Sequence, residues 1–484
     1  MNYRMLGRFI GKILVLELVF MVPALCISIF GGEWQSAVAF LKTMGLIFVL
    51  AHGLIFFGRK SKKNFFAKEG LACVGLSWIV MGLLGCLPFY LSGAIPKFID
   101  AFFEIVSGFT TTGASILTEI EGLPKGILYW RSFSHWLGGM GVLVFLLAIS
   151  SFGGGDNGFT MHLLRAESPG PNVGKLVPKM KQTAGILYLL YIVLTILDVF
   201  FLLAGGMSLF EAVCTAFGTA GTGGFGVKND SIAGYSPYIQ NVCTVFMLLF
   251  GVNFSCYYML LLRQVKSVFK DEELRMYLGM VAGSILLIVW NLRGVYGTLE
   301  ETVRHAAFQV ASIVTTTGYA TTDFDLWPGF SKAILLCLMI IGASAGSTGG
   351  GFKCSRVLLV LKSLRRSVRQ VVHPQKVQVV RVNGQPISEK VLSNTNAYLA
   401  AYAIITVGSF LLVSLDGFSI TTNISAVVAC FNNIGPGFEM VGPTGNFSAF
   451  SGFSKLVLIM DMLAGRLEIF PILILFSRTT WKHR

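Results

Sequence analysis

Long apolar runs separated by short polar stretches are the main pattern in this sequence, and they predict membrane-spanning helices. Several runs reach the roughly 20 residues that an α-helix needs to cross about 30 Å of hydrocarbon. Hydrophobic residues make up 54% of the 484 residues and charged residues only 13%, which excludes an ordinary soluble globule. The predicted crossings lie at about residues 9–30, 37–57, 70–92, 127–150, 183–205, 237–262, 277–292, 330–361, 396–415 and 453–477.

A shorter apolar segment stands between the third and fourth crossings, and again between the fifth and sixth, the seventh and eighth, and the ninth and tenth. At roughly 10 to 15 residues each segment is too short to span a bilayer, which predicts half-length helices that enter the membrane and turn back. Such backbone is tolerated at membrane depth only where protein buries it or water bathes it, as in a pore. The four predicted half-helices are Phe98 to Gly108, Leu209 to Phe217, Leu299 to Ile313 and Thr421 to Cys430.

Each half-helix ends in a short polar turn with a central glycine. Glycine tolerates unusual backbone angles, so carbonyl oxygens can point inward and replace the water around an alkali cation. The partial negative charge at the C-terminal end of the preceding half-helix favours the same cation. In the second turn either Gly223 or Gly224 is the central glycine; the aromatic residue after Gly224 favours Gly224, because Tyr319 likewise follows Gly318. The turns are Thr110–Ala114, Thr222–Phe225, Thr315–Tyr319 and Asn432–Pro436.

The turn glycines recur about every hundred residues, and this internal repetition predicts the architecture. We expect an all-α membrane protein in which an N-terminal helix hairpin precedes four repeats around one pore. Each repeat is a helix, a re-entrant half-helix with its filter loop, and a second helix. The predicted units are residues 1–66 for the hairpin and 67–155, 156–270, 271–370 and 371–484 for the four repeats.

The formal net charge of +14 is distributed unevenly. Basic residues cluster in connections that would share one side, such as 263–275, whereas the opposite connections carry acids such as Asp323. This positive-inside pattern places both termini in the cytoplasm and gives no reason to expect nucleic acid as a partner. Two of the basic connections, residues 153–182 and 362–395, are either docking surfaces for a protein partner or anchors at lipid headgroups.

Two features of the later crossings have a functional and a purely structural interpretation. The stretch Gly342–Gly351 is rich in glycine, alanine and serine, so a helix there is weak; the structural alternative is a small-residue helix interface. Its triple glycine favours a broken segment. Arg466 lies within the last crossing, where a charge is costly and is either functional or paired. A salt bridge to Asp461 or Glu468 is the alternative for this arginine.

The turns also carry a resemblance to a known family. The segments Ser107–Gly113, Thr315–Tyr319 and Phe431–Gly437 resemble the filters of the Trk/Ktr/HKT potassium transporter superfamily. The N-terminal hairpin, the segment His135–Gly141 and the ending Leu467–Pro471 are more similar to its TrkH branch than to KtrB. The resemblance covers nearly the whole chain. It implies a K⁺ filter made of Thr111, Thr112, Gly113, Thr222, Gly223, Gly224, Thr316, Thr317, Gly318, Asn433, Ile434 and Gly435.

The resemblance further implies a gate, partners and a location. The glycine-rich stretch is similar to the intramembrane loop that blocks the pore in this family, and Arg466 matches an arginine that lines the pore and contacts that loop. The implied gate residues are Gly346, Gly349, Gly350, Gly351 and Arg466. The implied protein is a K⁺-selective, channel-like uptake subunit in the plasma membrane of a bacterium. It would form a homodimer controlled by a TrkA-type cytoplasmic nucleotide-binding ring, and K⁺ would be its transported ion, with no covalently bound cofactor.

Two other classes of function would leave different features in the sequence. A proton- or sodium-coupled secondary symporter would use the glycine breaks as a midplane site, and it would show inverted repeats and carboxylates inside the spans. A membrane enzyme would need a catalytic cluster in a cytoplasmic loop, and the sequence offers none, so no enzyme is expected. The filter and gate pattern favours the channel-like transporter, with the symporter as the alternative.

Overall fold

Helices form almost all of the regular structure in this computed structural model, which describes residues 1–59, 67–139, 141, 180–376 and 378–481. One two-stranded hairpin is the sole sheet in that part of the chain. The helices of the first half are α1 (Tyr3–Phe30), α2 (Trp34–Phe57), α3 (Ala67–Gly85), α4 (Leu87–Leu91), α5 (Phe98–Phe109), α6 (Lys125–Gly139), α9 (Met180–Ala204) and α10 (Leu209–Gly221). The later elements are α11 (Pro237–Phe250), α12 (Phe254–Leu261), α13 (Val265–Lys270), α14 (Glu272–Asn291), α15 (Leu299–Val314), α16 (Gly329–Ile341), α17 (Cys354–Val372), β1 (Arg381–Val382), β2 (Gln385–Pro386), α18 (Glu389–Val413), α19 (Ile420–Phe431), α20 (Gly452–Arg466), α21 (Phe470–Phe476) and α22 (Arg478–Trp481).

Among the described residues, six helices are long and apolar enough to cross a membrane, and a bent pair raises the number to seven. The six lie in α1, α2, α3 with α4, α9, α14 and α18. The bent pair is α11 and α12, which meet at 86°. Gly251, Val252 and Asn253 separate the two helices, and the Asn253 side chain accepts a 2.9 Å hydrogen bond from the Ser255 backbone N–H to start the second one.

Three predicted crossings differ from single uninterrupted helices. The predicted span 237–262 contains the 86° bend just described, and the span 330–361 is interrupted between α16 and α17. The last span breaks after α20, where Glu468 and Ile469 both have positive φ. The predicted span 127–150 begins as α6, and its remainder lies outside the described residues.

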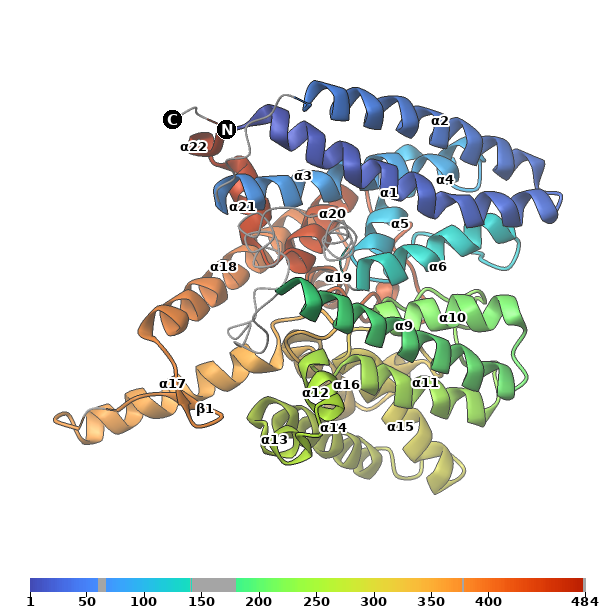
Figure 1. Cartoon of the computed structure of the whole chain (residues 1–484). Helices are drawn as coiled ribbons and strands as arrows, with labels where there is room; N and C mark the ends of the chain where they lie inside the picture. The colour runs from blue at the N-terminus through green and yellow to red at the C-terminus, as the bar shows by residue number, and fades with distance from the viewer. Residues whose placement is uncertain (60–66, 140, 142–179, 377, 482–484) are drawn as a thin grey trace.

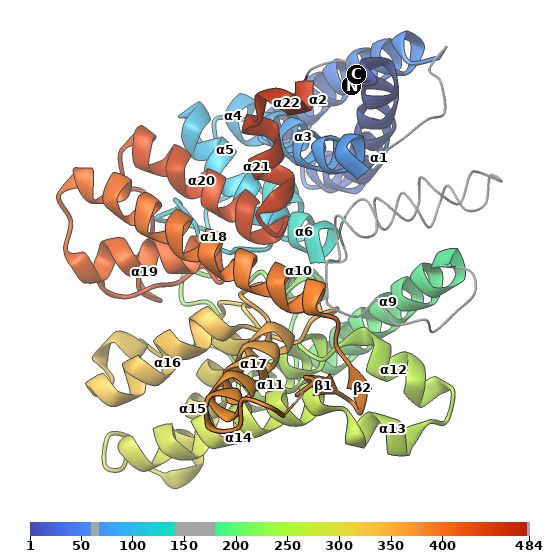
Figure 2. The same ribbon diagram turned by 90° about the vertical axis from the view of Figure 1, so that its left-hand side faces the viewer.

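The helices surround the centre of the molecule, as Figure 2 shows. Helices α1 and α2 form an antiparallel hairpin that lies outside the other helices at one edge, with α1 packed against α3 and α6. The start of α1 and the helix α22 lie side by side (Figure 1), where the Tyr3 hydroxyl donates a 3.0 Å hydrogen bond to the Trp481 carbonyl oxygen. The first and last described helices therefore begin and end on the same side of the molecule.

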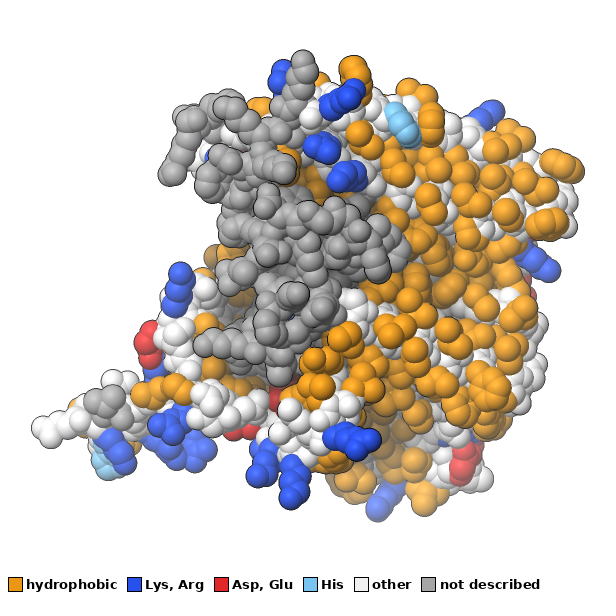
Figure 3. Space-filling model, in the orientation of Figure 1, with side chains coloured by type: hydrophobic (Ala, Val, Ile, Leu, Met, Phe, Trp, Pro, Cys, Tyr) orange, Lys and Arg blue, Asp and Glu red, His pale blue; other side chains and the backbone are white. Residues whose placement is uncertain are grey.

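Apolar side chains cover a large part of the outer surface. Figure 3 shows them over the right-hand half of the molecule, while Lys and Arg gather at the lower left, along the lower margin and at the top. The surface includes Val49 on α2, Phe200 on α9, Leu286 on α14 and Ile404 on α18, each more than 60% exposed. Exposed apolar area on this scale is unstable in water and is suited to contact with lipid chains.

Helix α17 and the β1–β2 hairpin project from the body of the molecule at lower left in Figure 1. They cover about half of the predicted basic connection 362–395, whose last residues, 389–395, belong to α18. Lys362 on α17 pairs with Glu272 on α14 and donates a 2.7 Å hydrogen bond to the Arg381 carbonyl oxygen. The projection is thereby fixed to the body. The other predicted connection, 153–182, lies almost wholly outside the described residues.

The four short helices α5, α10, α15 and α19 correspond to the predicted half-helices. The ends of α5, α15 and α19 fall within one residue of the prediction. The predicted end of α10, at Phe217, was wrong by four residues, because the helix continues through Gly218 to Gly221. The division into a hairpin and four repeats stays a prediction, and its boundary at residue 155 falls outside the described part.

Candidate functional site

The four turns have one common backbone geometry. At the end of each short helix one residue takes the left-handed conformation, with φ of 55° at Thr111, 54° at Thr222, 60° at Thr316 and 55° at Asn433. The next residue then donates its N–H to a carbonyl five residues back, at 2.8–2.9 Å in all four turns. This is the hydrogen bond that closes a Schellman-type helix end. Four non-glycine residues held at positive φ cost about 1–3 kcal/mol each, which is typical of a functional constraint.

A glycine at positive φ follows two residues further along each helix end. Its φ is 75° at Gly113, 75° at Gly224, 85° at Gly318 and 98° at Gly435. The backbone geometry thus makes Gly224, and not Gly223, equivalent to the other three glycines.

The four turns close into a ring. A Cβ atom added at Gly113 would collide with the carbonyl oxygen of Gly223, the residue just before Gly224. The same relation repeats from Gly224 to the Thr317 oxygen and from Gly318 to the Ile434 oxygen. It ends with Gly435, where a Cβ would lie 2.7 Å from the Thr112 oxygen. Each central glycine therefore leaves room for a carbonyl of the next turn, in the cyclic order first, second, third, fourth, first.

Side-chain contacts hold the turns on their helices. In the first turn the Thr110 and Thr112 hydroxyls are 2.8 Å apart, and Thr110 donates to the Val106 carbonyl at 2.7 Å. Thr315 and Thr317 repeat this arrangement in the third turn. In the fourth turn the Asn433 amide donates a 3.0 Å hydrogen bond to the Thr112 hydroxyl, which joins it to the first. All twelve predicted filter residues therefore lie in the ring or at its edge.

The glycine-rich break lies directly against this ring. Residues 342–353, which we call the broken segment, separate α16 from α17 and have no helical structure. The Gly350 N–H donates a 2.7 Å hydrogen bond to the Thr316 hydroxyl. A Cβ added at Gly350 would collide with the Asn432 carbonyl, and one at Gly349 would lie 2.9 Å from the Thr315 carbonyl.

The other two predicted gate glycines lie away from these turn contacts. Gly346 is exposed, and its carbonyl accepts a 3.0 Å hydrogen bond from the Phe254 N–H. Gly351 packs against Gly342 at the base of the broken segment.

Charged side chains pin the broken segment. The Arg466 guanidinium donates to the Thr348 carbonyl at 2.8 Å and to the carbonyls of Gly138 and Gly139 at the end of α6. Lys353 donates to the Gly349 carbonyl at 2.5 Å. On the other side the Glu273 carboxylate of α14 accepts a 2.6 Å hydrogen bond from the Ala345 N–H.

The two acids proposed as salt-bridge partners of Arg466 are engaged elsewhere. Glu468 forms an ion pair with Arg356, and Asp461 accepts a 2.6 Å hydrogen bond from Ser409. Arg466 instead donates to three backbone carbonyls, one in the broken segment and two at the end of α6, and its role at a gate stays a prediction.

An ion pair behind the ring was missed in the sequence. Arg131 on α6 and Glu104 on α5 are buried and 2.6 Å apart. Two opposite charges inside apolar segments were a signal that could have found them, since buried charges at membrane depth are paired or functional.

The loop after the fourth turn carries a carboxylate with a perturbed pKa. Glu439 accepts hydrogen bonds from the hydroxyls of Ser419 and Thr422 at the start of α19, and these lower its pKa. Its own N–H donates a 2.7 Å hydrogen bond to Asp325, in the loop after the third turn. Burial raises the pKa of Asp325. These acids link the loops that follow two neighbouring turns.

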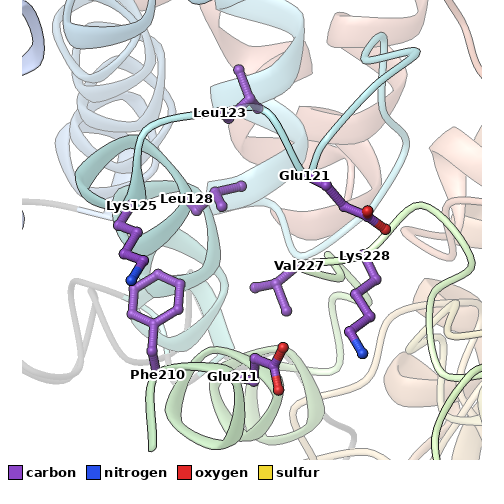
Figure 4. Close-up of a pocket in the computed structure, with 8 residues that line it drawn as sticks. All are labelled: Glu121, Leu123, Lys125, Leu128, Phe210, Glu211, Val227 and Lys228. Atoms are coloured by element: carbon purple, nitrogen blue, oxygen red, sulfur yellow. The ribbon is translucent and has the colours of Figure 1, made fainter. Parts of the chain in front are cut away.

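A pocket of about 300 Å³ opens where the loop after the first turn meets α10 and the loop after the second (Figure 4). Two acids and two lysines line it, so it has no net preference for either sign of charge. Its lining residues are Glu121, Leu123, Lys125, Leu128, Phe210, Glu211, Val227 and Lys228.

Comparison with known proteins identifies the family. The sequence profile of the TrkH family, described as a cation transport protein, matches residues 36–482. The chain belongs to the TrkH family. With the apolar helices described above, this makes it a multi-pass membrane protein. The match includes the four turns, the broken segment and Arg466.

Curated relatives and a solved structure are similar over the full length. The Trk system potassium uptake protein TrkH of Escherichia coli (strain K12) is 35% identical over 491 residues, which is 100% of both chains. The TrkH protein of Halomonas elongata is 34% identical over 492 residues, again 100% of both. The crystal structure of the potassium transporter TrkH from Vibrio parahaemolyticus matches with a TM-score of 0.88 and 32% identity, covering 100% of both chains. The similarity to TrkH proteins therefore covers the whole length of the chain.

Proposed function

We propose that this chain is a potassium uptake subunit that conducts K⁺ through the ring of four turns. The observation that carries the proposal is the cyclic approach of each central glycine to a carbonyl of the next turn. Rings of backbone carbonyls replace the hydration shell of a monovalent cation. The relatives named potassium uptake proteins and the potassium transporter of known structure support K⁺ as the cargo.

The ring offers oxygen atoms suited to such an ion. Among the described residues, the Thr111 hydroxyl and the Asn433 side-chain oxygen are buried without a hydrogen-bond partner, and they occupy equivalent positions in two turns. The short helices also direct their C-terminal carbonyl ends, with partial negative charge, toward the ring. Both features favour a cation and neither selects a divalent ion.

The broken segment acts as the gate in this proposal. It contacts two of the turns through Gly349 and Gly350, and Arg466 holds it to α6. The arginine charge next to the path adds an electrostatic barrier to cations. Opening requires the segment to leave the ring, which breaks hydrogen bonds at Thr348 and Ala345.

The proposed setting is the plasma membrane of a bacterium, with both termini in the cytoplasm. The basic side chains of α13 and α17 then face the cytoplasm and are a suitable surface for a TrkA-type nucleotide-binding ring. We further propose that the subunit acts as a homodimer. Four repeats around one path would make each protomer complete by itself.

Flux into proteoliposomes that contain only this protein tests the proposal. We expect uptake of K⁺ and Rb⁺ to follow the electrochemical gradient at equal pH on both sides, with much slower Na⁺ uptake. Protein-free liposomes provide the background. Uptake that requires a proton or sodium gradient would contradict the channel-like mechanism and favour the symporter.

A further inference from the structure

The buried ion pair between Arg131 and Glu104 bridges the backbone just beyond two neighbouring turns. Arg131 donates to the Gly226 carbonyl at 3.0 Å and to the Ser115 hydroxyl at 3.2 Å. Its Nε donates to Glu104 at 2.6 Å. The guanidinium thus reaches the loop after the first turn and the loop after the second at the same time.

Glu104 completes the attachment of the first loop. One carboxylate oxygen accepts a 2.9 Å hydrogen bond from the Ser115 hydroxyl, and the other accepts one from the Ile116 N–H at 2.9 Å. The side chains of Arg131 and Glu104 are 2% and 0% exposed. Hydrogen bonds therefore engage both carboxylate oxygens and all three guanidinium nitrogens, as a buried ion pair requires.

Phe225, the last residue of the second turn, is held by the same helix, α6. The Arg131 guanidinium lies 3.6 Å from the centre of the Phe225 ring. The ring of His135, one helical turn further along α6, stacks on Phe225 with centroids 4.1 Å apart. Phe225 is 1% exposed. Arg131 therefore fixes both the backbone and the side chain that directly follow Gly224.

These contacts fall at the place where the two turns meet. Ser115 follows Gly113 by two residues, and Phe225 follows Gly224 by one. Gly113 itself faces the Gly223 carbonyl. We infer that Arg131, neutralised by Glu104, is a positioning residue that sets the separation of the first and second turns and so contributes to ion selectivity. This inference rests on the proposed role of the ring as a K⁺ path.

The shape of the Arg131 side chain explains why a charged group can join the two turns. A guanidinium offers a rigid fork of donors that reaches several acceptors at fixed angles, which neither lysine nor an apolar side chain can do. Its charge would repel a cation if it stood alone. Glu104 cancels this charge, so the ion pair makes the two turns more rigid without an added electrostatic barrier to the ion.

The test compares two ion pairs that anchor the same helix, α5, one buried and the other partly buried. The double variant Glu104→Gln/Arg131→Gln, which we call the clamp variant, removes the ion pair and leaves no unpaired charge. The matched control is Asp100→Asn/Lys455→Gln, since Lys455 on α20 pairs with Asp100 in the first turn of α5 at 2.6 Å. The K⁺/Na⁺ permeability ratio is measured in proteoliposomes for both and for the unaltered protein. This ratio does not depend on the amount of folded protein.

We expect the ratio to fall by about fivefold or more in the clamp variant, because charge-assisted contacts to two turns are lost, and to stay unchanged in the control. An unchanged ratio in the clamp variant would overturn the inference while leaving the proposed function intact. If the unaltered protein fails to conduct K⁺, the proposed function falls, and the inference with it. An equal loss of selectivity in both variants would also overturn it, because a general softening of α5 would suffice.

Two single variants test the inference if the double variant Glu104→Gln/Arg131→Gln does not fold. Phe225→Leu keeps the ion pair but removes the ring that Arg131 and His135 enclose. Arg131→Lys keeps the charge but loses the fork. We expect both to lower the K⁺/Na⁺ ratio by about two- to fivefold, on the scale of one cation–π contact or one charged hydrogen bond. Unaltered ratios in both would overturn the inference.

Discussion

Arg466 donates a 2.8 Å hydrogen bond to the carbonyl oxygen of Thr348, which joins the last long helix to the centre of the broken segment. The same guanidinium donates to Gly138 and Gly139. One side chain thus holds the broken segment against the end of α6. Loss of this side chain should therefore free the broken segment.

Replacing Arg466 with alanine should raise K⁺ flux by at least about fivefold, because hydrogen bonds from a charged group to several carbonyls are lost together. The electrostatic barrier beside the path is lost as well. Flux is measured in proteoliposomes at fixed protein content. Arg293→Ala, at an exposed position, is the control and should leave flux unchanged. Equal fluxes in all three proteins would contradict a role for Arg466 in closure.

The opposite side of the broken segment should respond to Glu273. Its carboxylate accepts the Ala345 N–H, so Glu273→Ala removes this attachment and should raise flux about two- to fivefold. The neighbouring Glu272→Ala is the control, because Glu272 pairs with Lys362 on α17 and not with the broken segment. The prediction fails if the two variants change flux equally.

Gly113→Ser should lower the K⁺/Na⁺ permeability ratio by about tenfold. The new side chain would collide with the Gly223 carbonyl and would also strain a residue at φ 75°, at about 1–3 kcal/mol. Gly206→Ser separates these two effects, because Gly206 has φ 87° with open space around it. The control should lose some thermal stability and keep its selectivity. A normal ratio in Gly113→Ser would argue against the ring as the filter.

The contacts of Glu439 predict a pH-dependent stability. Hydrogen bonds from Ser419 and Thr422 lower its pKa, so its stabilising contribution is fully present above the ordinary glutamate pKa of about 4.3. The contribution is lost as the pH falls through the lower pKa of the folded state. Melting temperatures from pH 6 down to pH 3 should therefore drop more steeply for the unaltered protein than for Glu439→Gln. Parallel curves would show that this carboxylate contributes nothing.

The sequence was sufficient to locate the half-helices and the turns, because length, apolar character and glycine position are local properties. The predicted end of α10 was too early, because a glycine such as Gly218 weakens a helix without ending it. The residue that takes the left-handed conformation and ends this helix is Thr222. The equivalence of Gly224 to the other glycines became visible only in the backbone angles.

The contacts that support the site were beyond reach from the sequence. Arg131 and Gly226 are 95 positions apart, and Arg466 and Thr348 are 118 apart. Each pairing depends on how whole helices pack, which no local pattern records. The breaks at Glu468 and Ile469 were missed for a similar reason, because β-branched and charged residues give no signal for positive φ.

The ring has a consequence for how its selectivity can change over generations. In an assembly of identical subunits, one altered codon would appear at every corner of the ring at once. Here each turn has its own codons in one chain. The central glycines are Gly113, Gly224, Gly318 and Gly435, and each has different neighbours. A single substitution alters one quarter of the circle and leaves three intact. In the proposed filter, preference among alkali metals can thus change in small inherited steps, with three of the four turns retained at each one.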